Sequence, residues 1–244
     1  DAAGKGRAIP DRLLRFYLTR HVEKMFAGSA GEISPRVREV LPPSASAASV
    51  DAAVAALARA ERPLMVIGSQ ALAIAAEAPR IAAAVGQLGI PVYLSGMARG
   101  LLGRDHVLQM RHQRRQALRE SDCVVLAGVP CDFRLDYGRH VRRGATLIAA
   151  NRSAKEARMN RRPDIAAIGD AGLFLQRLGA ALAQSGNRWS SWIEEVRTRD
   201  LKREAEIEAQ AKPQAEFVNP IAFFRALEHA AGENAVMVAD GGDF

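Results

Sequence analysis

The sequence has only two cysteines and no long run of apolar residues. Cys123 and Cys131 cannot form a disulfide framework, so we expect a reducing compartment and a cytoplasmic protein. We expect Cys123 in the core, within a buried strand, whereas Cys131 follows a strand in a loop where it can be exposed. No apolar run approaches the roughly 20 residues that a helix needs to cross a bilayer, which excludes an integral membrane protein. No secretory signal is expected at the start.

Aromatic residues are also scarce, at 5%, although the chain carries a net charge of +7. A basic chain is typical of proteins that bind nucleic acids, but this one has few aromatic rings on which single-stranded bases could stack. The positive charges are spread along the chain, with one local cluster at Arg111, Arg114, Arg115 and Arg119. We therefore expect no nucleic-acid partner. Steeply salt-dependent binding to DNA would contradict this expectation.

Several familiar motifs are missing. No Gly-x-Gly-x-x-Gly follows the first expected strand, which disfavours ordinary NAD-dependent hydride transfer. No Gly-x-Ser-x-Gly elbow and no paired Cys-x-x-Cys spacing occur. His106 and His112 lie near Asp105, but we expect them to be solvated rather than bound to a metal. We expect no catalytic residue and no metal site in this chain.

The sequence does contain short apolar runs that alternate with helical stretches, among them residues 108–120 and 173–183. Continuous apolar runs of about five residues are typical of strands buried on both faces of a parallel sheet. The expected strands cover residues 63–67, 90–94, 122–127, 145–150 and 164–168. This pattern predicts an α/β fold with a doubly wound, mostly parallel sheet, a Rossmann-like domain over residues 49–186.

The flanking segments have a different composition. Residues 1–48 are predicted to be an interdomain linker with one amphipathic helix over 10–27. Linker helices are predicted within residues 187–232, at 188–210 and 220–231. An apolar run at 235–239 predicts that residues 233–244 hold the first strand of a truncated domain. Because the chain begins at Asp1 rather than Met, we expect it to be a piece of a longer protein.

Candidate binding residues follow from the expected sheet. Ligands of open parallel sheets bind beyond the carboxyl ends of the strands, where glycine lets the backbone approach a phosphate closely. Arg99, Arg134 and Arg152 would add bidentate phosphate contacts there. A dinucleotide, an adenosine phosphate or coenzyme A would suit this set. An equally weighted alternative is that the glycines only make tight turns.

Four segments resemble the central domain of thiamine-diphosphate-dependent enzymes, in the acetolactate synthase-like and 2-hydroxyacyl-CoA lyase group. They are residues 63–70, 89–92, 96–103 and 122–128. Residues 131–138, 147–152 and 168–170 also resemble later parts of that domain, and residues 238–244 resemble the entry into the diphosphate-binding domain. The resemblance covers about residues 49–244.

The resemblance implies that the parent protein is a carbon–carbon lyase or ligase that uses thiamine diphosphate and Mg²⁺. Its substrate would be a small-molecule 2-keto acid or 2-hydroxyacyl-CoA, and it would be a homodimer or homotetramer. The activating glutamate and the magnesium motif of this family are not in this chain. Gly242, Asp243 and Phe244 match only the first loop that touches the diphosphate. We therefore expect the fragment alone to be inactive.

The central domains of this family bind FAD, or ADP and coenzyme A, or nothing. Carried over by position, the cofactor-binding residues of this chain would be Gly68, Ser69, Gln70, Met97, Arg99, Asp132, Phe133, Arg134, Asn151 and Arg152. Asn151 stands where the family often has an acid, which puts the adenosine contact in doubt. The segment 132–138 favours the acyl-CoA lyase branch. The alternative is a non-catalytic module that binds a nucleotide or coenzyme A and forms an oligomer interface.

Overall fold

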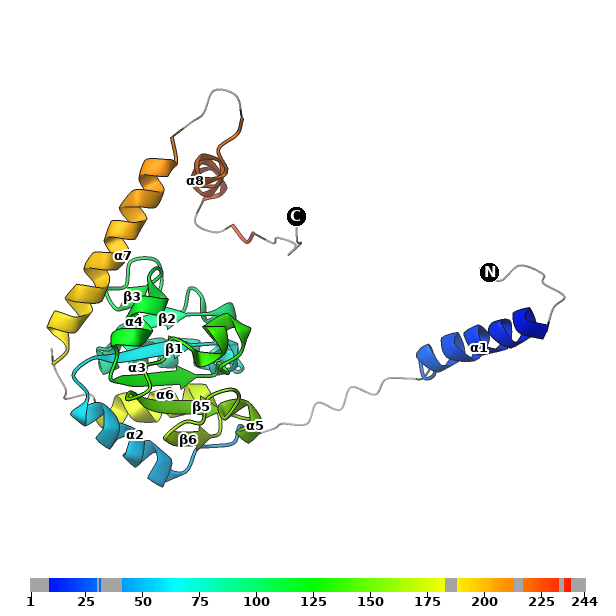
Figure 1. Ribbon diagram of the computed structural model, residues 1–244, viewed down its shortest axis with the longest axis horizontal. Helices are drawn as coiled ribbons and strands as arrows, with labels where there is room; N and C mark the ends of the chain where they lie inside the picture. The colour runs from blue at the N-terminus through cyan, green and yellow to red at the C-terminus, as the bar shows by residue number, and fades with distance from the viewer. Residues whose placement is uncertain are drawn as a thin grey trace. The chain divides into compact units, whose positions relative to one another are not determined.

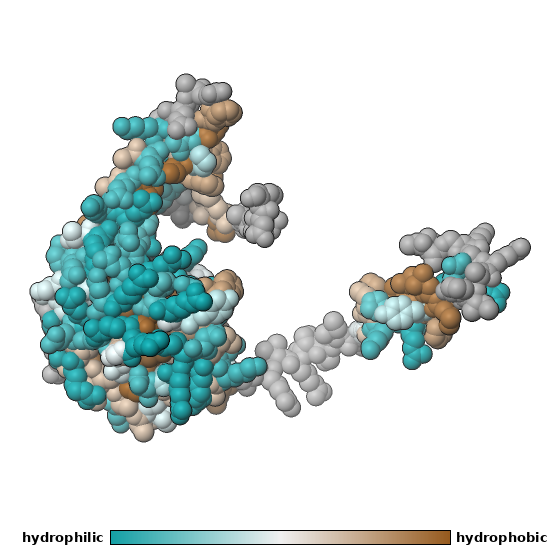
Figure 2. Space-filling model, in the orientation of Figure 1, coloured by the Kyte–Doolittle hydropathy of each residue, from teal (hydrophilic) through white to brown (hydrophobic). Residues whose placement is uncertain are grey.

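The computed structural model describes residues 9–29, 31, 41–182, 188–212, 217–232 and 235–237. By its internal contacts the chain divides into two units, residues 1–41 and 42–244. In the first unit, α1 (Ile9–Met25) is the expected helix. Its apolar side chains are exposed, Leu13 to 65% and Phe16 to 64%, and Figure 2 shows brown patches on the surface of this helix. The expected boundaries at 49, 187 and 233 stay predictions.

The second unit is built on one parallel sheet of six strands. These are β1 (Pro63–Ile67), β2 (Val92–Leu94), β3 (Gln109–Met110), β4 (Cys123–Ala127), β5 (Thr146–Asn151) and β6 (Ile165–Ile168). Their order is β3-β2-β1-β4-β5-β6, and every neighbouring pair is parallel (Figure 1). All residues of β1 and β4 are buried. The predicted doubly wound fold is confirmed.

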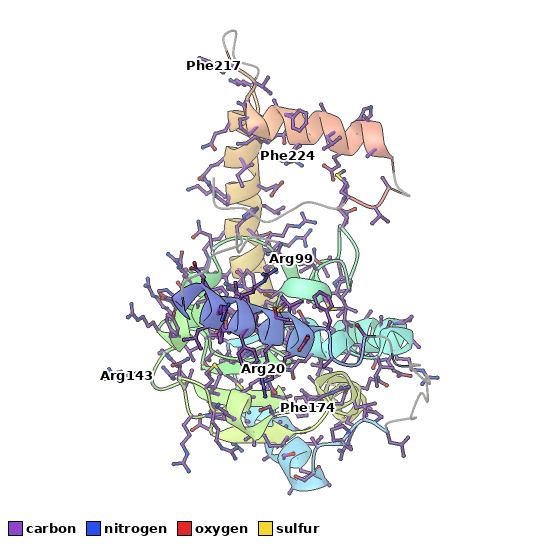
Figure 3. All side chains as sticks on the ribbon, turned by 90° about the vertical axis from the view of Figure 1, so that its right-hand side faces the viewer. Arg20, Arg99, Arg143, Phe174, Phe217 and Phe224 are labelled. Atoms are coloured by element: carbon purple, nitrogen blue, oxygen red, sulfur yellow. The ribbon has the colours of Figure 1, made fainter. Side chains whose placement is uncertain are left out.

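Helices cover both faces of the sheet. The unit contains α2 (Ala47–Arg59), α3 (Ala78–Leu88), α4 (Arg114–Glu120), α5 (Ala154–Ala157), α6 (Ala171–Leu182), α7 (Ser190–Gln210) and α8 (Pro220–Ala231). Alternate β1 side chains enter two cores: Met65 packs with α2, α3 and α6, and Leu64 with α4 and α7. Phe174 of α6, labelled in Figure 3, is among the largest fully buried side chains.

Two expectations about secondary structure were wrong or untested. A helix was expected over 108–120, but β3 occupies Gln109–Met110 and α4 begins only at Arg114. The strand extends the sheet because Gln109 and Met110 pair with Val92 and Tyr93 of β2. Two residues are too few to show alternation in the sequence. Of the strand expected at 235–239, residues 235–237 have no regular secondary structure, and the remainder lies outside the described residues.

Two tryptophans fix the start of α7 to the start of the sheet. Trp189 Nε1 donates to the Ala60 carbonyl at 2.9 Å, and Trp192 Nε1 donates to the Pro63 carbonyl at 2.8 Å. Both indole rings are almost fully buried. Further along α7, the buried Asp200 accepts hydrogen bonds from the loop after β3. α7 is therefore docked on the sheet along its first half through a few buried residues, while most of its residues are exposed or half-buried.

Candidate functional site

The sequence predicts the site beyond the carboxyl ends of the strands, and the structure has a crevice there, at the point where the strand order reverses. β1 has β2 on one side and β4 on the other, so the connections leave the sheet in opposite directions at this point. A cavity of about 160 Å³ opens at the carboxyl ends of β1 and β4. Its lining residues are Gly68, Ser69, Gln70, Ser95, Gly128, Val129, Pro130, Arg134 and Glu156. We call this cavity the crevice.

The glycines of the crevice serve the packing of its own loops. A Cβ on Gly68 would lie 2.6 Å from the Gly128 carbonyl oxygen, and a Cβ on Gly128 would lie 2.5 Å from the Ala71 nitrogen. Gly128 also has φ +70°, a conformation that suits glycine. The loops after β1 and β4 thus need glycine in order to touch each other. The sequence left two roles for these glycines, close approach to a phosphate and tight turns. These contacts support the role in tight turns.

Hydrogen bonds within the crevice hold its polar side chains in place. Gln70 Nε2 donates to Glu156 Oε2 at 2.6 Å, and Gln70 Oε1 accepts from the Arg152 backbone at 3.4 Å. Ser69 Oγ accepts from the Met97 backbone at 3.1 Å. The loops after β1, β2 and β5 are therefore tied together. A ligand in the crevice would meet side chains that are already oriented.

Two arginines expected to bind phosphate are paired with carboxylates. Arg134 Nε donates to both carboxylate oxygens of Asp132, at 3.0 and 3.1 Å, and these hydrogen bonds lower the pKa of Asp132. Arg152 donates to Asp170 Oδ2 through Nε at 3.1 Å and Nη2 at 2.5 Å. The Asp170 side chain is only 4% exposed. Each guanidinium charge is thus compensated by a neighbouring carboxylate, although the arginine side chains themselves are partly exposed.

The other predicted residues are more dispersed. The crevice brings together Gly68, Ser69, Gln70 and Arg134. Met97 and Phe133 are about 70% exposed and do not line it. Asn151 is buried, and its Oδ1 accepts from the Ser153 backbone at 2.8 Å. Gly242, Asp243 and Phe244 lie outside the described residues.

A larger cavity, of about 580 Å³, lies beside the carboxyl ends of β2 and β3. Four arginines line it: Arg99, Arg104, Arg111 and Arg114. We call it the arginine pocket; Arg99 is labelled in Figure 3. From the sequence, Arg99 is a predicted site residue, whereas Arg111 and Arg114 belong only to a cluster of charge. The strand β3 brings Arg111 to the same edge of the sheet as Arg99, and a strand of two residues gives no recognisable pattern in the sequence.

The cysteines and histidines have structural surroundings. Cys131 is buried, contrary to the expectation that it can be exposed, because η4 (Phe133–Gly138) folds over it. Burial raises the pKa of Cys123 to about 12 and that of Cys131 to about 11. His112, expected to be solvated, lies 2.7 Å from Glu204 of α7. The described residues include no cluster of three or more metal-ligating side chains, and none of their helices is long and apolar enough to cross a membrane.

Comparisons with known proteins agree with one another. A family model described as "Thiamine pyrophosphate enzyme, central domain" matches residues 50–178. Human 2-hydroxyacyl-CoA lyase 2 is 40% identical over 247 residues, 98% of this chain and 38% of that protein. The acetolactate synthase large subunit IlvG of Mycobacterium tuberculosis is 32% identical over 230 residues, 91% of this chain and 40% of that protein. The chain spans about two fifths of the length of these relatives.

Proposed function

Because this chain belongs to the thiamine pyrophosphate enzymes, whose central domain it contains, we propose that it works within a thiamine-diphosphate-dependent carbon–carbon lyase or ligase. The resemblance found in the sequence is confirmed by the family model. Within such an enzyme, we propose that this domain binds the nucleotide part of a coenzyme. The observation that carries this role is the crevice at the reversal of strand order, where nucleotides bind in open α/β sheets.

The relatives favour a coenzyme A thioester as the substrate class. The chain is 40% identical to a 2-hydroxyacyl-CoA lyase and 32% identical to an acetolactate synthase. We therefore propose a 2-hydroxyacyl-CoA substrate, and propose that the crevice takes the adenosine end of coenzyme A in preference to FAD. A homodimer or homotetramer stays a prediction, as does a cytoplasmic location.

We propose that the thiamine diphosphate site lies mostly outside the described residues. They include no group of three or more His, Cys, Asp or Glu side chains that could hold a metal ion, and Gly242, Asp243 and Phe244, which match a diphosphate loop, lie outside them. When bound, the cofactor of this family supplies carbanion chemistry. The described part of this chain would contribute by holding the coenzyme end of the substrate.

Turnover and binding together test this proposal. The full-length chain, with thiamine diphosphate and Mg²⁺, should cleave a 2-hydroxyacyl-CoA and release an aldehyde, which a coupled dehydrogenase assay detects. Residues 1–244 alone should bind coenzyme A in calorimetry without turnover. Binding by the full-length chain without cleavage of any 2-hydroxyacyl-CoA or 2-keto acid would favour the second candidate, a non-catalytic coenzyme-binding and assembly module. The crevice at the reversal of strand order is the observation that favours this candidate, because binding of a coenzyme there requires no catalytic group.

A further inference from the structure

The wall of the arginine pocket is strongly positive. Its lining carries four guanidinium groups, and no aspartate or glutamate is among the described residues that line it. Arg104 forms an ion pair with Glu228 of α8. Among the described residues, no carboxylate lies within ion-pair distance of Arg99, Arg111 or Arg114. Three uncompensated positive charges therefore face one cavity.

Mutual repulsion makes such a cluster unfavourable without an anion. Burial lowers the pKa of Arg114, Tyr93 opposes this shift, and the neighbouring charges of Arg115 and Arg99 add to it. Like charges gathered in a partly enclosed space raise the local potential and attract counterions. An anion in the pocket would relieve this repulsion. The arrangement thus resembles a binding wall more than a structural network, in which each charge would have a partner.

The guanidinium groups are held in place but keep free donors. Arg111 Nη2 donates to the Arg104 carbonyl at 2.5 Å, and Arg114 Nη2 donates to the Arg134 carbonyl at 2.6 Å. Each guanidinium has five N–H donors, so several of them stay available to a ligand. The Arg111 backbone is itself fixed by Asp200 Oδ1, at 2.7 Å. Donors fixed before binding lose little entropy when a phosphate arrives.

An unpartnered acceptor lies in the same wall. Gln109 Oε1 is buried and has no hydrogen-bond partner among the described residues. Buried polar atoms normally have a partner; Gln109 lines the pocket, and a rotation of its amide would present this oxygen to an N–H or O–H of a ligand. The pocket thus offers donors for phosphate oxygens and one acceptor beside them. A phosphate ester that also carries a hydrogen-bond donor has this chemistry.

We propose that the arginine pocket binds the phosphate groups of the coenzyme through Arg99, Arg111 and Arg114. This inference rests on the proposed function and deepens it, because the crevice then holds only the nucleoside part. The two cavities adjoin: Leu94 lines the pocket, the next residue, Ser95, lines the crevice, and Arg114 contacts the Arg134 backbone. In the crevice itself, Arg134 is compensated by Asp132. The uncompensated charge therefore lies in the pocket.

Calorimetry on the full-length chain tests the assignment with inorganic diphosphate and 5′-ADP as probes. Arg99→Gln and Arg111→Gln should each weaken the binding of both probes roughly tenfold, the loss expected for one charge-assisted contact. Arg119→Gln is the matched control. Arg119 is exposed on α4, so this substitution removes the same charge outside the pocket. Adenosine 3′,5′-bisphosphate distinguishes the source of the phosphate. If it loses more affinity than 5′-ADP in these variants, the pocket takes the 3′-phosphate rather than the diphosphate.

The outcomes separate this inference from the proposed function. If 5′-ADP binds and only Arg134→Ala weakens it, the pocket assignment is overturned while nucleotide binding stands. If diphosphate binds and is lost in Arg99→Gln, but adenosine adds no affinity, the pocket is supported and the crevice is not. Absence of diphosphate binding at low salt overturns the pocket assignment. Arg99 has no hydrogen bond to other described side chains, so Arg99→Gln stays informative even if Arg111→Gln disturbs folding.

Discussion

Single residues of the site depend on partners that are distant in the sequence. Arg152 and Asp170 are 18 residues apart, yet the guanidinium of Arg152, a predicted phosphate ligand, forms an ion pair with Asp170. The positions of the glycines and arginines at strand ends followed from the alternation of apolar runs and helices. The sequence does not show which arginines form ion pairs. The Arg152–Asp170 pair, for example, forms only because β5 and the loop after β6 lie side by side in the folded protein.

Arg152→Ala should therefore destabilise the protein rather than mainly weaken a ligand. It would leave the buried Asp170 carboxylate without its cation, although Oδ1 still accepts from the Leu173 backbone at 2.9 Å. We expect the free energy of unfolding to fall by about 2 kcal/mol at pH 7. Urea denaturation followed by circular dichroism measures this. Arg162→Ala, at an exposed arginine, serves as the control, and equal stability of the two variants would show that the Arg152–Asp170 pair contributes nothing.

At the scale of elements, the sequence predicted long and strongly patterned segments well. The helix expected over 220–231 coincides with α8, and the strand expected over 63–67 coincides with β1. β3 was missed because two residues carry no periodicity, and because their strand conformation comes from pairing with β2. The docking of α7 was also missed. Most residues of α7 are charged or polar, so the sequence does not indicate that Trp192, Val196 and Asp200 are buried.

Asp200 links α7 to the loop that carries Arg111. Its Oδ1 accepts from the Arg111 backbone at 2.7 Å and from the His112 backbone at 2.6 Å. Asp200→Ala leaves both N–H groups without this acceptor, so we expect a loss of about 2 kcal/mol in the free energy of unfolding. Asp200→Asn keeps an acceptor oxygen and should lose less than half of that. Chemical denaturation of both variants checks the order, and an equal loss in both would show that the carboxylate charge matters instead.

At the scale of the whole molecule, the chain has one folded unit with its own core and a separate first unit. The residues just after Leu41 belong to the second unit and contribute hydrogen bonds that stabilise it. The Asp170 backbone donates to the Pro43 carbonyl at 2.6 Å, and Arg177 donates to the Ala45 carbonyl at 2.5 Å. Ser46 Oγ accepts from the Ser49 backbone and caps α2.

Two truncations should therefore differ in effect. Removal of residues 1–41 should leave the melting temperature of the second unit within about 2 °C of that of the chain. Removal of residues 1–46 also deletes the cap of α2 and the contacts of Pro43 and Ala45. Loss of a helix cap alone costs about 1 kcal/mol, which lowers the melting temperature by a few degrees. Scanning calorimetry of both truncations measures the difference, and identical melting would place the true boundary later than residue 46.

The two tryptophans at the start of α7 have a spectroscopic consequence. They are the only tryptophans of the chain, and arginine guanidinium groups lie over the rings, Arg62 at 5.2 Å from Trp192 and Arg188 at 5.8 Å from Trp189. Intrinsic fluorescence excited at the red edge of indole absorption thus originates entirely from the junction between α7 and β1. It will report the release of that helix from the sheet, and it will be silent about any rearrangement confined to the first unit.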